Sequence, residues 1–125
     1  MTGVQTCALP ILNTFGTNRR GASLRWDGVR IGTESGAEVH AIHAGRVIFA
    51  DWFRNLGLLI ILDHGAGYMS LYGYNQNLLK KTGDWVPAGE IIAYAGDSGG
   101  QEEPAVYFEI RHNGKPMDPA RWVAR

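Results

Sequence analysis

The chain has 125 residues, with 12 Lys and Arg against 12 Asp and Glu, so its formal net charge is zero. That balance argues against non-specific nucleic-acid binding, which needs a basic surface. The only cysteine, Cys7, excludes an intramolecular disulfide. Seventeen glycines and little helical periodicity predict a mostly β domain, and a chain of this length can bury roughly two-thirds of its unfolded surface.

The start of the chain differs in character from the rest. Residues 1–10 lack the basic start and the long apolar stretch of a secretory signal. We predict that residues 1–10 are a non-native or disordered lead-in and that residues 11–125 form a single domain. The stretch ILNTFG, which opens that domain, indicates a strand and a turn.

Short strands and glycine-containing turns alternate from residue 36 onwards. The run LGLLIILDH is rich in branched apolar residues, as expected for a strand buried on both faces. Residues 76–81 are predicted to form one helical turn, and Pro87 belongs at a turn or an edge because proline cannot donate to a β-ladder. Strands are predicted, in chain order, at residues 37–42, 45–52, 56–64, 68–75 and 90–96.

The last strand pair, PAVYFEIRHNGKP, turns at Asn113-Gly114, a dipeptide suited to a type I′ hairpin. Ala105 and Tyr107 lie two residues apart in this stretch, so they point to the same face of a strand. Two histidines at this spacing could hold one metal ion, but here the pair is a methyl group and a phenol. Repeated short strands of this kind predict a small antiparallel β-sheet or sandwich domain.

Four blocks, in their order along the chain, resemble the LytM-type domain of the lysostaphin-like zinc peptidases. They are GAEVHAIHAGRV, ILDHGAGYMSLYGYN, TGDWVPAGEIIAYAGDSG and PAVYFEIRHNGKPMDP. The resemblance covers about residues 11–123. It implies a small antiparallel β domain with a surface groove, in which active members bind Zn²⁺ and cut peptide cross-bridges of the bacterial cell wall.

At the family's metal and catalytic positions, the resemblance places residues that cannot do the same chemistry. Trp26 and Arg30 take the places of a ligand histidine and the ligand aspartate, Tyr107 that of the last ligand, and Tyr74 and Ala105 those of the catalytic histidines. Trp and Ala offer no lone pair to a metal, and Arg is a permanent cation. Tyr would have to lose a proton at about pH 10. The resemblance therefore implies a domain without zinc, without another cofactor and without peptidase activity.

The stretches RVIFADW, LDHGAGYMSLYGYNQ and YFEIR are similar to the degenerate LytM domains of EnvC-type murein hydrolase activators. These activators are periplasmic and act at the division septum of Gram-negative bacteria, where they switch on N-acetylmuramoyl-L-alanine amidases. The resemblance implies that the groove captures the autoinhibitory helix of such an amidase. It also implies contact with a division-site membrane complex through an N-terminal region that precedes this fragment.

The predicted groove offers aromatic rings as contact area and arginines that can pair with the carboxylates or last carbonyls of a helix. Glu109 lies in a block common to the family and is expected to serve the fold. The predicted partner-binding residues are Trp26, Asp27, Arg30, Leu56, Leu59, Tyr74, Ala105, Tyr107 and Arg111.

Other interpretations remain open at this point. The same aromatic slot could bind cell-wall glycan or peptide, because aromatic faces suit sugars, and an active zinc endopeptidase with unusual ligands is a further hypothesis. The histidines of the chain are expected to be exposed or hydrogen-bonded rather than metal ligands. Asp63, His64 and Ser70 include the residue types of a catalytic triad, but no nucleophile elbow surrounds the serine.

Overall fold

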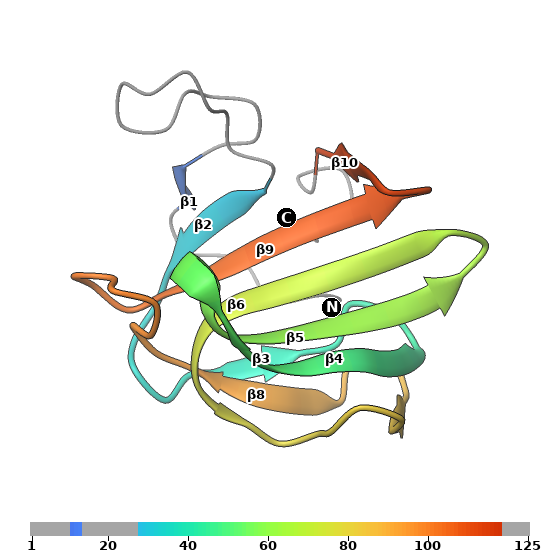
Figure 1. The fold of residues 1–125 in the computed structure, drawn as a ribbon. Coiled ribbons are helices and arrows are strands. Elements are labelled where there is room, and N and C mark those ends of the chain that lie inside the picture. The colour runs from blue at the N-terminus through green and yellow to red at the C-terminus, as the bar shows by residue number, and fades with distance from the viewer. Residues whose placement is uncertain (1–10, 14–27, 119–125) are drawn as a thin grey trace.

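The computed structural model describes residues 11–13 and 28–118, which form ten strands and one short 3-10 helix (Figure 1). Every strand pairing is antiparallel, so the predicted mostly β, antiparallel class is confirmed. Within these residues no helix has the length and apolar character needed to cross a membrane. The elements are β1 (Ile11–Asn13), β2 (Val29–Gly32), β3 (Glu38–His40), β4 (Gly45–Phe53), η1 (Arg54–Leu56), β5 (Gly57–Gly65), β6 (Tyr68–Leu78), β7 (Trp85–Val86), β8 (Ile91–Ala95), β9 (Ala105–His112) and β10 (Lys115–Met117).

One twisted sheet carries most of these strands, in the order β1-β2-β9-β6-β5-β4-β7. The strand β8 leaves that order by pairing with the end of β6 and with β3, and Figure 1 shows β8 below β4 and β5. Apolar side chains of β3 and β8, including Val39 and Ile92, pack in one cluster with Ile60, Tyr72 and Phe108 of the main sheet. The core therefore lies on one face of the main sheet, and β3 and β8 do not cover the opposite face.

Two features of β5 and β6 compare directly with the sequence predictions. Leu59 is buried on one face of β5 while Ile60 and Leu62 are buried on the other, which confirms the strand buried on both faces. The helical turn predicted at residues 76–81 is wrong, because β6 continues to Leu78. There it pairs with β8 and packs against the core, and this pairing outweighs the local helical preference.

The turn between β9 and β10 has the predicted geometry. Asn113 and Gly114 have φ values of 53° and 79°, so both central residues are left-handed, as a type I′ turn requires. The turn fixes the register in which Lys115 pairs with His112. The predicted type I′ hairpin is thus confirmed.

Candidate functional site

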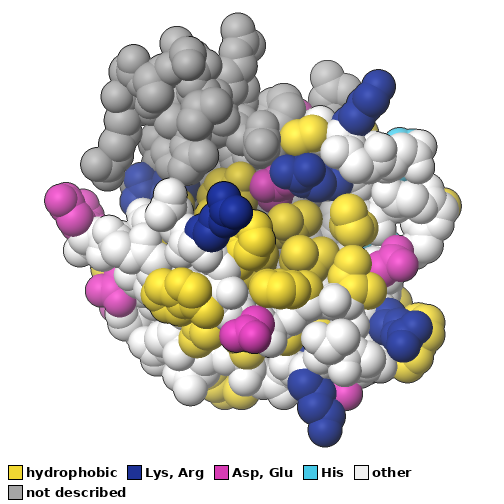
Figure 2. Space-filling view, in the orientation of Figure 1, with side chains coloured by type: hydrophobic (Ala, Val, Ile, Leu, Met, Phe, Trp, Pro, Cys, Tyr) yellow, Lys and Arg dark blue, Asp and Glu magenta, His cyan; other side chains and the backbone are white. Residues whose placement is uncertain are grey.

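The face of the main sheet opposite the core is hollowed by a groove with a volume of about 330 Å³, which lies over β4, β5, β6 and β9. Figure 2 shows the apolar patch in the middle of this face, with Lys or Arg side chains along its upper edge. Seven apolar and two charged residues line the groove: Phe49, Phe53, Leu56, Leu59, Ile61, Met69, Leu71, Glu109 and Arg111.

Strand register explains why these side chains meet. Phe49 is the pairing partner of Ile61, Ile61 of Leu71, and Leu71 of Glu109, so one row of side chains crosses four strands. Paired residues point to the same face of a sheet. The sequence shows this alternation, but it does not show which face the other strands leave uncovered. The apolar lining residues Phe49, Phe53, Ile61, Met69 and Leu71 were therefore not predicted.

A compact cluster of the predicted residues closes one end of the groove. Tyr74, Ala105 and Tyr107 are buried together, with Leu56 packed against them. The ring centroids of Tyr74 and Tyr107 are 5.8 Å apart, and the guanidinium carbon of Arg30 lies 5.8 Å from the centroid of the Tyr74 ring. Residues from three separate strands, β2, β6 and β9, therefore converge, and we call Arg30, Tyr74, Ala105 and Tyr107 the aromatic cluster.

Tyr74 reaches this cluster only because the backbone breaks the strand alternation. Regular alternation along β6 would place Tyr74 with Tyr72 in the core. Tyr74 instead has a φ of 68°, in the left-handed region, which is unfavourable for a bulky side chain. Next to it, the buried Asn75 Nδ2 donates to the carbonyls of Leu58 at 3.0 Å and Tyr72 at 2.9 Å. These bonds hold the irregular backbone in place.

The predicted binding residues thus fall into three sets. Leu56, Leu59 and Arg111 line the groove. The aromatic cluster lies at its end, where Tyr74 is 2% and Tyr107 5% exposed, so these rings support the groove through Leu56. Trp26 and Asp27 lie outside the described residues. A binding role for any of them stays a prediction.

The chemistry of the aromatic cluster does not fit a zinc ion. Zinc in proteins is held by His, Cys or carboxylate groups, whereas this cluster presents a guanidinium, a methyl group and two phenols. The Tyr107 hydroxyl donates to Glu109 Oε1 at 2.7 Å, which commits its proton to a neighbour. Across residues 11–13 and 28–118, no three His, Cys, Asp or Glu side chains lie together as a metal site would need.

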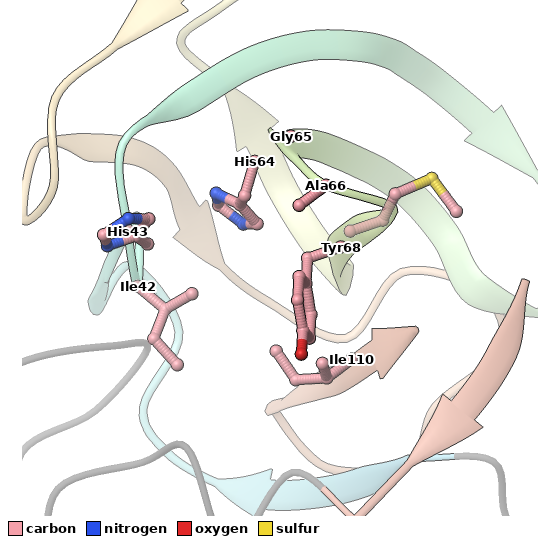
Figure 3. Close-up of a pocket in the computed structure, with 8 residues that line it drawn as sticks. Ile42, His43, His64, Gly65, Ala66, Tyr68 and Ile110 are labelled. Atoms are coloured by element: carbon pink, nitrogen blue, oxygen red, sulfur yellow. The ribbon is translucent and has the colours of Figure 1, made fainter. Parts of the chain in front are cut away.

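A second hollow, of about 300 Å³, lies at the other end of β5 and β6 (Figure 3). Beside it runs a chain of hydrogen bonds whose proton positions can be assigned. His64 Nδ1 lies 2.8 Å from the Ala44 carbonyl and must donate, so Nε2 accepts from Ser70 Oγ at 2.6 Å. Ser70 Oγ then accepts from Tyr72 Oη at 2.7 Å, and Tyr72 Oη accepts from the Ile42 amide at 3.1 Å. These hydrogen bonds connect the turn before β4 to β5 and β6.

The same contacts show that Asp63, His64 and Ser70 are not a catalytic triad. Asp63 Oδ1 accepts from the Gly65 amide at 3.0 Å, and the group that orients His64 is a backbone carbonyl. Ser70 is fully buried, so its hydroxyl is closed to a substrate. The expectation that histidines serve as hydrogen-bonding groups is confirmed for His64 and for His40, whose Nδ1 is 2.8 Å from the Gly89 carbonyl.

The hydrogen-bond chain predicts a pH dependence of stability. Burial lowers the pKa of His64 from its ordinary value of 6.5, and the opposing bond to the Ala44 carbonyl is a smaller effect. The unfolded chain therefore binds a proton more readily than the folded one, so the free energy of unfolding should be largest above pH 6.5 and fall as the pH drops below it.

Urea unfolding measured between about pH 5 and pH 8 checks this dependence. The variant His64→Gln should flatten it. The control His43→Gln should keep it with a small displacement, because the charge of His43 is among the causes that lower the pKa of His64. An unchanged pH dependence in His64→Gln would refute the assignment.

The chain is similar in sequence to two murein hydrolase activators. The chain is 49% identical over 116 residues to the murein hydrolase activator EnvC of Escherichia coli K12, covering 93% of this chain and 27% of that protein. It is 34% identical over 114 residues to the murein hydrolase activator NlpD of the same strain, covering 90% and 29%. The chain thus spans less than a third of these curated relatives.

The fold of the chain is similar to that of solved peptidase structures. The catalytic domain of lysostaphin from Staphylococcus simulans superposes with a TM-score of 0.83 at 26% identity, covering 91% of both chains. A zinc-containing peptidase from Vibrio cholerae reaches 0.86 at 26% identity, covering 94% of this chain and 37% of that one. Residues 24–119 match Peptidase family M23. The predicted resemblance is therefore confirmed, and the chain belongs to peptidase family M23.

Proposed function

We propose that this chain is the partner-binding domain of a murein hydrolase activator and has no peptidase activity of its own. It activates N-acetylmuramoyl-L-alanine amidases by holding their autoinhibitory helix in the groove, for daughter-cell separation. The observation that carries the proposal is the aromatic cluster next to an apolar groove. Its residues stand where the resemblance expects the metal and catalytic groups of the family. The names of two relatives, both murein hydrolase activators, support it.

The floor of the groove favours a helix over an extended peptide. The strands β5, β6 and β9 each pair on both sides, so their backbone groups are already engaged. An extended peptide laid on this face would bury its own amides and carbonyls without partners, which is costly. A helix satisfies those groups internally and can present apolar anchors at i, i+3 and i+4 to the row formed by Phe49, Ile61 and Leu71.

The charged residues suggest which side chains such a helix carries. Arg111 lines the groove next to Glu109, and the exposed Arg54 follows Phe53 at its rim. Carboxylates on the flank of the helix that meets these arginines would complete the interface through charge-assisted hydrogen bonds. The proposed occupant is thus an amphipathic helix with one apolar stripe and an acidic flank.

The proposal places the chain in the periplasm of a Gram-negative bacterium, at the division septum. A relative from Pseudomonas aeruginosa, 38% identical over 99 residues, is named a lipoprotein, which is in keeping with an envelope location. Contact with a division-site membrane complex is proposed for regions of the longer relatives beyond the matched part. Peptidoglycan is the alternative ligand of the same face.

Release of dye from labelled cell wall tests the function. Three samples are compared: the chain alone, a purified autoinhibited amidase alone, and the two mixed. We expect release only in the mixture. Zinc-dependent release by the chain alone would instead show an active endopeptidase. Binding of the chain to isolated peptidoglycan, without any effect on the amidase, would show a cell-wall binding module.

A further inference from the structure

One buried carboxylate lies on the groove face of the sheet. Glu109 is 2% exposed, yet it occupies the groove side of β9 and pairs with Leu71, at the end of the apolar row. An ionised carboxylate in such a place costs free energy unless charged and hydrogen-bonding partners surround it. An apolar side chain at this position would continue the row without that cost.

Two partners of Glu109 come from its own strand. The Tyr107 hydroxyl donates to Oε1 at 2.7 Å, and Arg111 Nε donates to Oε2. Residues 107, 109 and 111 share one face because strand side chains alternate. Arg111 Nη1 is also 3.4 Å from the Gly114 carbonyl in the β9–β10 turn. The guanidinium is therefore held at two of its nitrogens, while Arg111 lines the groove and 32% of its side chain is exposed.

We propose that Glu109 is a positioning residue of the groove. It holds the Arg111 guanidinium in the orientation that meets a bound helix, and it holds Tyr107 in the aromatic cluster that supports the groove through Leu56. This inference rests on the proposed function. Ordering a long arginine side chain costs entropy when it happens on binding. Glu109 orders Arg111 before the helix arrives, so the interface forms around a side chain already in place.

A coupled set of variants tests the role. Glu109→Leu keeps a similar volume and removes both acceptors, while Glu109→Gln keeps an uncharged acceptor. The concentration of chain that gives half-maximal stimulation of the amidase should rise about tenfold or more for Glu109→Leu and less for Glu109→Gln. In a chain that already carries Tyr107→Phe and Arg111→Met, Glu109→Leu should add less than about twofold, because the groups it positions are gone.

Thermal unfolding of each variant separates positioning from loss of fold. Equal penalties for Glu109→Leu in both backgrounds, or none in a folded chain, would overturn the inference. The NMR signal of Arg111 Nε–H in the free chain gives an independent readout: it should be protected from exchange in the wild type and lost in Glu109→Leu. If the wild type fails to stimulate the amidase, the proposed function fails. The NMR measurement still tests the inference in that case. If the Arg111 Nε–H signal stays protected in Glu109→Leu, Glu109 does not order Arg111.

Discussion

Replacing Phe53 with alanine should weaken amidase activation by about 5- to 150-fold, whereas replacing its neighbour Trp52 should leave activation unchanged. The two residues are adjacent on β4 and similarly exposed, at 44% and 55%. Successive strand residues point to opposite faces, and of the two only Phe53 lines the groove. An aromatic anchor at the groove rim should contribute about 1–3 kcal/mol to a helix interface.

The pair is matched, because both changes remove a large exposed aromatic ring from the same strand. Neither should lower the thermal midpoint by much, since exposed rings contribute little to the core. The measurement is the amount of chain needed for half-maximal dye release in the presence of amidase. Equal losses in the two variants, or full activity in Phe53→Ala, would argue that the partner binds elsewhere.

Replacing Gly57 with alanine should destabilise the fold by about 3 kcal/mol or more. Gly57 begins β5 with φ 66° and ψ −140°, a conformation open to glycine. A Cβ there would lie 2.2 Å from Ser98 Oγ and 2.6 Å from the Ser98 carbonyl carbon. Ser98 Oγ accepts from the Leu58 amide at 3.1 Å and donates to the Asn75 carbonyl at 2.7 Å, so displacing it breaks two bonds beside Tyr74.

Gly65 provides the control for Gly57. Its φ is 87°, and a Cβ there would meet nothing within 4 Å. Gly65→Ala should therefore cost only the strain of a left-handed residue, about 1–2 kcal/mol. Denaturant unfolding of both variants separates the two effects. Similar costs for Gly57→Ala and Gly65→Ala would mean that Ser98 yields easily and that this junction is softer than the contacts indicate.

Much of the fold follows from local sequence signals. The Asn113-Gly114 turn, the alternation in the last strand and the branched run of β5 each predict their structure through a known periodicity or dihedral preference. The end of β6 does not, because Leu78 becomes strand through pairing with β8, which the sequence places 15 residues later. Contacts between distant segments decide such stretches, and local propensity is a weak guide to them.

Some residues of the candidate site could be predicted from the sequence, and others could not. Arg30, Tyr74, Ala105 and Tyr107 could be singled out from the sequence because a family pattern marks their positions, and the structure brings them together. The left-handed backbone of Tyr74 could not be foreseen, since tyrosine rarely adopts it. The groove walls Phe49 and Leu71, and the bonds that tie Glu109 to its neighbours on β9, depend on register and on which face is left uncovered.

A methyl NMR spectrum of the chain, recorded first with Zn²⁺ and then with an amidase that the chain stimulates, tests the central claim most directly. The Ala105 methyl reports on the aromatic cluster, and the groove carries further probes at Leu56, Leu59, Ile61, Met69 and Leu71. We predict no change at Ala105 with Zn²⁺, and shifts at the groove methyls with the amidase. Stoichiometric binding of Zn²⁺ that moves the Ala105 signal, or stimulation of the amidase that leaves every groove methyl unmoved, would contradict the account.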